Sequence, residues 1–300
     1  MGVDLVRSRR WRTVAASVAG TSHTQTGLPC ADACRVRTLR LRGGGTLLVA
    51  VAADGAGTAA RAAEGARLAC EAILDEAERW AKSASARVGS RASSRAGHRP
   101  TRERCTPLRS LSAFTREDVV RWADAARRRI ARAARSLGLE SRDFSCTLLV
   151  ALVDETVAVF FQIGDGAIVY RTAAGEYVPA LWPQNGEYAN STWFVTGDEA
   201  AGRVQAAVVE AVHEVALLTD GLQRLALRLV GREAHGPFFE PMFARLRREP
   251  AAARERLLRE LRAFLRSPAV NQRTDDDKTL VLATRLSATT NGGARARPES

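Results

Sequence analysis

The chain has 300 residues, of which 46% are hydrophobic and 26% are charged, a balance typical of a globular protein with a substantial core. No apolar run reaches the roughly 18 residues that a membrane-spanning helix needs, and the basic N-terminus lacks the apolar segment of a signal peptide. The five cysteines show no CxxC pair, which argues against a disulfide framework and a zinc site. These features predict a protein of the reducing cytoplasm that does not enter a membrane.

The net charge of +12 would, taken alone, favour a nucleic-acid partner. The excess is confined to residues 1–12, 82–110 and 285–300, and the remaining chain is neutral. The expected folded elements therefore carry no basic face, and nucleic acid is disfavoured as a partner.

The first strands are expected at residues 11–18 and within 35–53. The continuous apolar run 46–53 is typical of a strand buried on both faces, and it stops at Asp54-Gly55. The hydrophobic pattern thus places an acidic turn directly at the end of a core strand.

Two helices follow in the pattern. One is expected after Thr58, which can serve as an N-cap, and the other runs from about Thr115 to Gly138. Between them, residues 83–110 are small, polar and rich in arginine, which predicts a flexible basic insert.

The second half predicts further strands and helices. Strands are expected at 146–153, 156–163, 167–173, 214–219 and 279–285, and helices at 222–230, 241–249 and 252–266. Strands, two helices, more strands, more helices and a closing strand favour one α+β layered domain over 11–286, with a disordered tail at 287–300.

Acidic residues recur at the ends of the apolar strands. Asp54-Gly55 follows 46–53, Asp220-Gly221 follows 214–219, and three aspartates precede 279–285. Each Asp-Gly pair alone is explained by a hairpin turn. If the acids meet at one sheet edge, they need a cation to stay ionised, and an oxygen-only site favours Mg²⁺ or Mn²⁺.

Four segments in chain order resemble the metal-dependent type-2C protein serine/threonine phosphatases: LLVAVAADGAGT, TLLVALVDETVAVFFQIGDGAIVY, VALLTDGL and TDDDKTLVLAT. The family pattern is a strand ending in DG, a strand followed by GDS or GDG, a strand ending in (S/T)DG, and a terminal D(N/D)xT. All four occur in family order, and 186–196 and 237–246 resemble a bacterial subgroup of the family.

This resemblance implies an α-β-β-α sandwich of two antiparallel sheets flanked by helices. It implies two Mn²⁺ or Mg²⁺ ions at one end of the sandwich, and a water bridging them that attacks the phosphorus of phosphoserine or phosphothreonine in proteins. The expected partners are phosphoprotein substrates and a serine/threonine kinase that phosphorylates them.

The resemblance also assigns residues. Asp54 matches the aspartate that bridges both metals, and Gly55 matches the glycine that lends its carbonyl. Asp220 and Asp276 match further metal aspartates. Asp165 matches the GDS aspartate, for which a turn is a sufficient explanation, so a structural role is favoured over a role in the site.

The sequence departs from the family pattern at three places. Asp32 can stand for the second acid of a Glu-Asp pair, but Ala31 occupies the glutamate position. Ala56 occupies the place of a proton-donating histidine, and the phosphate-binding arginine is missing. His23 is the candidate to take over as catalytic acid or phosphate ligand, with an exposed loop histidine as the alternative.

These departures keep other functions open. The leading hypothesis is a phosphoprotein phosphatase in which Asp54, Asp32 and His23 act in catalysis. A catalytically weak relative could instead bind phosphoprotein or a kinase as a regulatory module. An anion or nucleic-acid binder acting through the basic insert is the third hypothesis, and the insert has few aromatic residues for stacking on bases.

Overall fold

The computed structural model describes residues 11–42, 44–83, 110–184 and 192–286. Almost all of the expected insert at 83–110, and the expected tail at 287–300, lie outside the described residues. None of the helices within the described ranges combines the length and the apolar character needed to cross a membrane.

Two five-stranded antiparallel sheets form the centre of the molecule. The first has the strand order β1-β12-β9-β6-β7 and the second β2-β3-β4-β5-β8. The strands are β1 (Trp11–Val18), β2 (Ala33–Arg40), β3 (Thr46–Ala53), β4 (Leu148–Val153), β5 (Val157–Ile163), β6 (Ala167–Arg171), β7 (Tyr177–Leu181), β8 (Gln205–Glu210), β9 (Glu214–Leu218) and β12 (Lys278–Arg285), besides the short hairpin of β10 (Leu227–Arg228) and β11 (Glu233–Ala234).

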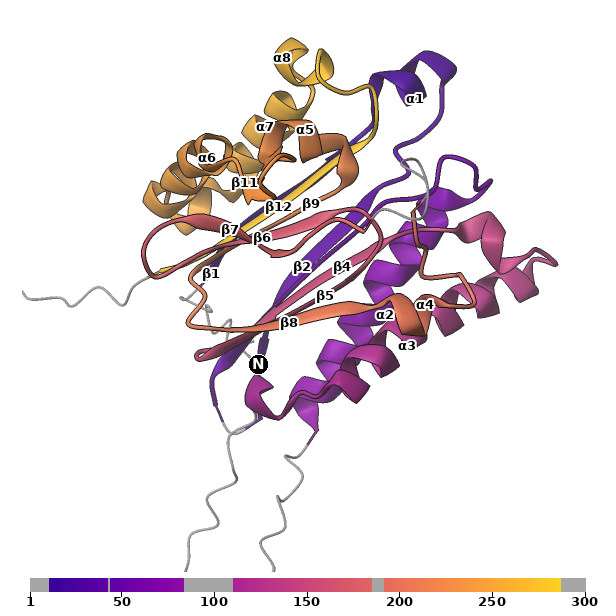
Figure 1. Cartoon of the computed structure of the whole chain (residues 1–300), viewed down its shortest axis with the longest axis horizontal. Helices are drawn as coiled ribbons and strands as arrows, with labels where there is room; N and C mark the ends of the chain where they lie inside the picture. The colour runs from indigo at the N-terminus through magenta and orange to yellow at the C-terminus, as the bar shows by residue number, and fades with distance from the viewer. Residues whose placement is uncertain (1–10, 43, 84–109, 185–191, 287–300) are drawn as a thin grey trace, which may run out of the picture.

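Helices cover the outer face of each sheet, so the order of layers is α-β-β-α (Figure 1). The α-helices are α1 (Thr21–Thr26), α2 (Ala62–Lys82), α3 (Arg116–Ser136), α4 (Ala200–Arg203), α5 (Gln223–Ala226), α6 (Gly236–Arg248), α7 (Arg254–Leu265) and α8 (Pro268–Asn271). Short 3₁₀ turns are η1 (Leu111–Ala113), η2 (Ser141–Phe144), η3 (Asp220–Leu222) and η4 (Ala251–Ala253). The expected α+β sandwich is thereby confirmed.

Three apolar clusters fill the three spaces between these layers. One joins α2 and α3 to the second sheet, and another joins α6 and α7 to the first sheet. The third lies between the two sheets, where Leu48, Leu149, Phe160, Leu217 and Val281 are essentially inaccessible to solvent. This middle cluster fixes the two sheets face to face, so loops at the same end of both sheets can share one site.

The helix expected after Thr58 begins later than predicted. α2 starts at Ala62, with Arg61 in the N-cap position and no side-chain cap. The second helix follows the prediction closely, because Thr115 and Asp118 form a reciprocal capping box and Gly138 adopts a left-handed conformation beyond its end.

The helix expected over 222–230 is wrong in its extent. Only the four residues of α5 are helical, and the chain then turns into the β10–β11 hairpin. Leu229 and Val230 lie exposed at the tip of that hairpin, so they do not continue the buried stripe that the pattern suggested. The last long helix, expected over 252–266, is α7, and Pro268 lies three residues beyond its end and begins α8.

Candidate active site

Carboxylates from separate parts of the sequence meet at one end of the sandwich. Asp54 follows β3, Asp165 lies between β5 and β6, and Asp220 begins the turn after β9. One oxygen of each of these three side chains lies within 4.8 Å of the others. Asp276, just before β12, is close enough for its charge to raise the pKa of both Asp165 and Asp220.

The backbone around Asp54 is held by the start of β4. Its amide donates to Thr147 Oγ1 at 2.9 Å, and its carbonyl accepts from the Thr147 amide at 2.8 Å. Gly55 forms an isolated bridge with Cys146, and a Cβ at Gly55 would lie 2.7 Å from the Ala31 carbonyl oxygen. Only glycine fits there, and its small size lets the Asp54 turn approach the loop that carries Asp32.

A second close approach lies on the other sheet. A Cβ added to Gly221 would lie only 2.0 Å from the carbonyl oxygen of Asp277. Glycine after Asp220 therefore lets the turn that follows β9 lie against the chain that enters β12. Asp220 and Asp276 are brought to the same end of the sheet by this contact.

Asp32 lies beside this cluster and is buried. Its Oδ2 accepts hydrogen bonds from the hydroxyls of Thr219 and Thr279, each at 2.8 Å. Asp32 and Asp54 are neighbours, since the charge of Asp32 is one cause of the raised pKa of Asp54. The sequence-predicted residues Asp32, Asp54 and Asp220 are thus brought together, with Asp276 at the margin.

Burial raises the pKa of every carboxyl in this group. It raises that of Asp32 to about 7 and that of Asp220 to about 6, with the neighbouring aspartates adding to both. The pKa of Asp54 is raised well above its ordinary value, first by burial and then by the charges of Asp32 and Asp220. Burial likewise raises the pKa of Asp165 and Asp276. Ionising the whole group therefore costs free energy, which a bound cation would offset.

The carboxylate oxygens themselves fit a bound cation. Among the described residues, Asp32 Oδ1, Asp165 Oδ1 and Asp220 Oδ1 are buried without a hydrogen-bond partner. Buried polar atoms are rarely left unpaired, so three such acceptors in one cluster need an explanation. An all-oxygen set of anionic ligands matches a hard divalent cation such as Mg²⁺ or Mn²⁺.

The two cysteines that flank Asp32 do not add to this ligand set. Burial raises the pKa of Cys30 and of Cys34, so both thiols stay protonated at neutral pH. A metal binds the thiolate rather than the thiol. Among the described residues, neither cysteine belongs to the group whose possible ligand atoms converge, and that group offers only carboxylate oxygens.

His23 lies in α1 and faces Asp277. Its Nδ1 is 2.9 Å from Asp277 Oδ2, a contact that would be an ion pair with a protonated imidazole, although the ring is not aligned for a hydrogen bond. Asp277 is almost fully buried and also accepts from the amides of Gly20 at 2.7 Å and Ala31 at 2.5 Å. This carboxylate ties both ends of the loop between β1 and β2 to the entry of β12.

The two alanines that break the family pattern lie inside this frame. Ala31 and Ala56 are both buried, and the Ala56 amide donates to the Ser145 carbonyl at 2.9 Å. Neither side chain can ligate a metal or transfer a proton. Any such role at this end of the sandwich falls to other residues.

Asp165 lies in the site, although its Gly-Asp-Gly motif favoured a purely structural role in a turn. Its carboxylate is one of the three whose oxygens converge. The signal was present in the sequence, because Gly164-Asp165-Gly166 follows an apolar strand in the same way that Asp54-Gly55 and Asp220-Gly221 do.

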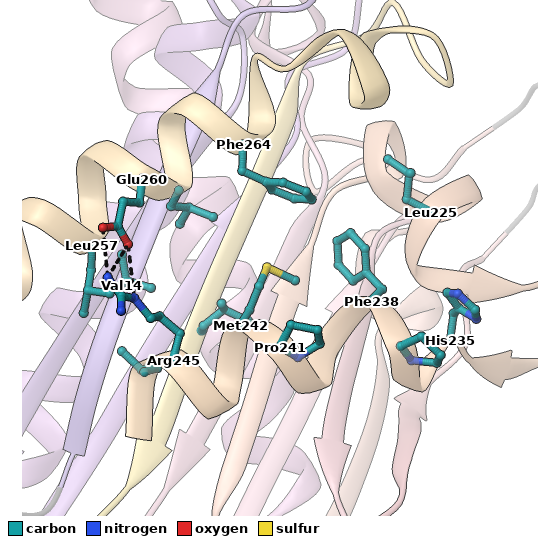
Figure 2. Close-up of a pocket in the computed structure, with 14 residues that line it drawn as sticks. Val14, Leu225, His235, Phe238, Pro241, Met242, Arg245, Leu257, Glu260 and Phe264 are labelled. Carbon is teal, nitrogen blue, oxygen red and sulfur yellow. Dashed lines mark hydrogen bonds and ion pairs between the residues drawn. The ribbon is translucent and has the colours of Figure 1, made fainter. Parts of the chain in front are cut away.

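An apolar cavity of about 640 Å³ lies elsewhere, between α6, α7 and the first sheet (Figure 2). Phe238, Met242 and Phe264 line it, and an ion pair of 3.1 Å between Arg245 and Glu260 borders it. None of the converging aspartates lines this cavity, so the carboxylate chemistry is separate from it.

Comparison with known proteins agrees with this geometry. A family model described as protein phosphatase 2C matches residues 19–266. Serine/threonine-protein phosphatase 3 of Escherichia coli (strain K12) is 36% identical over 274 residues, which cover 91% of this chain and 98% of that protein.

Solved structures show the same fold. The serine/threonine phosphatase Stp1 from Staphylococcus aureus has a TM-score of 0.53 and 12% identity, covering 96% of this chain and 100% of that one. The catalytic domain of the phosphatase PstP, in complex with 2 manganese ions, has a TM-score of 0.52 and 15% identity, covering 93% and 99%. With a family model over most of its length and a relative of this identity, the chain belongs to the protein phosphatase 2C family.

Proposed function

We propose that the chain is a metal-dependent protein phosphatase that hydrolyses phosphoserine and phosphothreonine in proteins with two Mn²⁺ or Mg²⁺ ions. The observation that carries this proposal is that carboxylate oxygens of Asp54, Asp165 and Asp220 lie within 4.8 Å of one another. One buried oxygen of Asp165 and one of Asp220 have no hydrogen-bond partner among the described residues. The Escherichia coli relative, a serine/threonine phosphatase, and the manganese complex of PstP support the substrate class and the metal.

Within this proposal each residue has a defined task. Asp54 has both Asp32 and Asp220 as neighbours, so its carboxylate would help to hold both ions, and the Gly55 carbonyl would add a further oxygen ligand. Asp220 and Asp276 would hold the ions from the other sheet, and Asp165 would hold them from the crossover between the sheets. Bound ions would lower the pKa of a water and neutralise charge on the phosphoryl group. Asp32, fixed by two hydroxyls, adds negative charge on the side of Asp54.

His23 is the residue that we assign to the leaving group. Its Nδ1 faces Asp277, which leaves Nε2 as the ring nitrogen available to substrate. A histidine whose far nitrogen lies against a buried carboxylate is oriented for proton transfer at the other nitrogen. The proton would go from Nε2 to the serine or threonine oxygen as its bond to phosphorus breaks.

The proposal extends to the protein's partners and to its location in the cell. A phosphatase of this kind needs a kinase that phosphorylates serine or threonine in the same proteins, and we place both in the cytoplasm. One phosphatase domain over 11–286 would carry the activity, with the basic insert at 83–110 and the tail at 287–300 as additions to it. The arginines of the insert could attract acidic phosphoproteins, because arginine pairs well with phosphate.

Replacing the converging aspartates tests the proposed site. Asp54→Asn should lower kcat on p-nitrophenyl phosphate and on a phosphothreonine peptide by about a hundredfold or more, because loss of an ion costs several kcal/mol of transition-state stabilisation. Asp220→Asn, Asp165→Asn and Asp276→Asn should cause smaller losses and should also weaken Mn²⁺ binding in calorimetry.

The matched control for these variants is Asp75→Asn. Asp75 lies on the outer face of α2 and pairs with Arg129 at 2.5 Å, a surface contact worth little. It should keep full activity and Mn²⁺ affinity. Full activity of Asp54→Asn would contradict the proposed site. A wild-type protein with no turnover in Mn²⁺, but with retained phosphopeptide binding, would favour the regulatory module that the substitutions at Ala31 and Ala56 suggest.

The stability of the metal-free protein should depend on pH in a defined direction. The pKa of Asp220 is raised to about 6 and that of Asp32 to about 7, whereas an exposed aspartate titrates near 4. The folded state therefore binds more protons than the unfolded state between about pH 4 and 7, and its free energy of unfolding should fall as pH rises through that window.

The test is to measure the midpoint temperature of thermal unfolding in the presence of a metal chelator, at a series of pH values between about 4 and 7. Excess Mn²⁺ should raise the midpoint most at the high-pH end, where the carboxylates are ionised, by an amount that grows with the logarithm of Mn²⁺ concentration. Asp220→Asn should reduce the slope measured in chelator. A flat profile in chelator, together with no shift in Mn²⁺, would contradict a buried carboxylate site for cations.

The role of His23 predicts a dependence on the leaving group. A phosphothreonine peptide leaves a strongly basic alkoxide that needs a proton, whereas p-nitrophenolate leaves without one. His23→Ala should therefore lower kcat on the peptide by about 10²-fold and leave kcat on p-nitrophenyl phosphate within a few-fold. His235→Ala, remote from the carboxylates, is the control and should change neither. Equal losses on both substrates would assign His23 to phosphate binding instead.

A further inference from the structure

Asp32 owes its position to two threonines to which no role has been assigned so far. We propose that Thr219 and Thr279 are positioning residues for the metal site: their hydroxyls hold one oxygen of Asp32 so that the other faces Asp54 and the ions. This inference rests on the proposed function.

The contacts are specific to the carboxylate. Thr219 Oγ1 and Thr279 Oγ1 each lie 2.8 Å from Asp32 Oδ2, and both threonines are completely buried. A buried threonine on a strand commonly donates to a backbone carbonyl, but these two donate to the same carboxylate oxygen. Two hydrogen bonds to an anion, one from the end of β9 and one from its neighbour β12, fix both the place and the rotation of the side chain.

The hydrogen-bond directions agree throughout this small network. The Thr279 amide donates to Thr219 Oγ1 at 2.9 Å, so the Thr219 hydroxyl uses its own proton for Asp32. Thr279 Oγ1 also lies 2.7 Å from Ser17 Oγ. A hydroxyl has one proton, so when Thr279 donates to Asp32, Ser17 donates to Thr279 rather than to Cys34 Sγ, its other neighbour at 3.5 Å. Both threonine hydroxyls then donate to Asp32 Oδ2.

The free oxygen of Asp32 gives the arrangement its function. Asp32 Oδ1 is buried and has no hydrogen-bond partner in the described part of the chain. Because Oδ2 is held by two threonines, Oδ1 is the oxygen left free for the ions that Asp32 and its neighbour Asp54 would share. An oxygen that is buried, anionic and unpaired can be offset by a cation or by water bound to one.

The threonines also link Asp32 to the other metal carboxylates along the chain. Thr219 directly precedes Asp220, and Thr279 follows Asp276 by three residues. Loss of either hydroxyl would therefore loosen Asp32 relative to the two strands that carry the ion-holding aspartates. Metal ligands whose supporting contacts are removed typically lose about 10- to 100-fold in metal affinity.

The test uses Thr219→Val and Thr279→Val, which keep the shape and remove the hydroxyl, and Thr219→Ser and Thr279→Ser, which keep the hydroxyl. Mn²⁺ affinity is measured by calorimetry on the folded protein, and kcat and KM are measured with a phosphothreonine peptide. Both valine variants should lose about 10- to 100-fold in Mn²⁺ affinity, with a lower kcat and a KM within a few-fold of wild type. The serine variants should recover most of that loss.

Thr284→Val is the matched control. Thr284 is also buried on β12, and its hydroxyl donates to Glu214 at 3.0 Å, away from the cluster. This variant should lose thermal stability without losing Mn²⁺ affinity. Unchanged Mn²⁺ affinity in both threonine-to-valine variants, or an equal loss in Thr284→Val, would overturn the inference. If a valine variant does not fold, the alanine variant at the same position replaces it, with the same two outcomes.

Asp54→Asn separates this inference from the proposed function. If Asp54→Asn loses Mn²⁺ and activity while the valine variants keep both, the positioning role alone is wrong. If Asp54→Asn also keeps Mn²⁺ affinity and turnover, the proposed metal site itself is wrong.

Discussion

Repulsion among buried carboxylates is the constraint on which this end of the molecule depends. Asp32, Asp54, Asp165 and Asp220 are drawn from four separate parts of the sequence. Burial raises the pKa of each of them, and the charge of at least one neighbouring aspartate adds to each shift. Such a group costs folding free energy unless a cation binds it. The fold tolerates the cost because three apolar clusters hold the layers together elsewhere. Stability and cation binding are therefore coupled in this protein.

Asp154 shows what a buried aspartate looks like when its role is structural. Its two oxygens accept hydrogen bonds from the amides of Leu111, Thr156 and Val157 and from the Ser110 hydroxyl, at 2.7–2.9 Å. These bonds lower its pKa although burial acts in the opposite direction. Unpaired oxygens and a raised pKa distinguish the converging aspartates from Asp154, since burial alone is common to both.

The sequence predicted the elements better than the contacts between them. Strand runs such as 46–53 and 279–285 were assigned correctly because burial on both faces leaves an unbroken apolar pattern. The hydrophobic pattern failed at 222–230. Its leucines and arginines fit one continuous helix as well as they fit the short helix and hairpin that the structure has there. Asp54 and Asp220 could be predicted as neighbours from their strand-end motifs. The hydrogen bonds from the two threonine hydroxyls to Asp32 could not be predicted, because they join residues that are 187 and 247 positions apart in the sequence.

The division of the ligands between the two sheets links the site to the architecture. Asp54 follows β3 in one sheet, whereas Asp220 and Asp276 adjoin β9 and β12, which pair in the other. Asp165 lies where the chain crosses from one sheet to the other, between β5 and β6. Cations bound by these aspartates would link the two sheets at one end, while the apolar cluster between the sheets holds their faces together. Any slide of one sheet over the other would change the separation of the ligands. The geometry of the proposed site is thus set by the packing of the middle layer as much as by the loops that carry the aspartates.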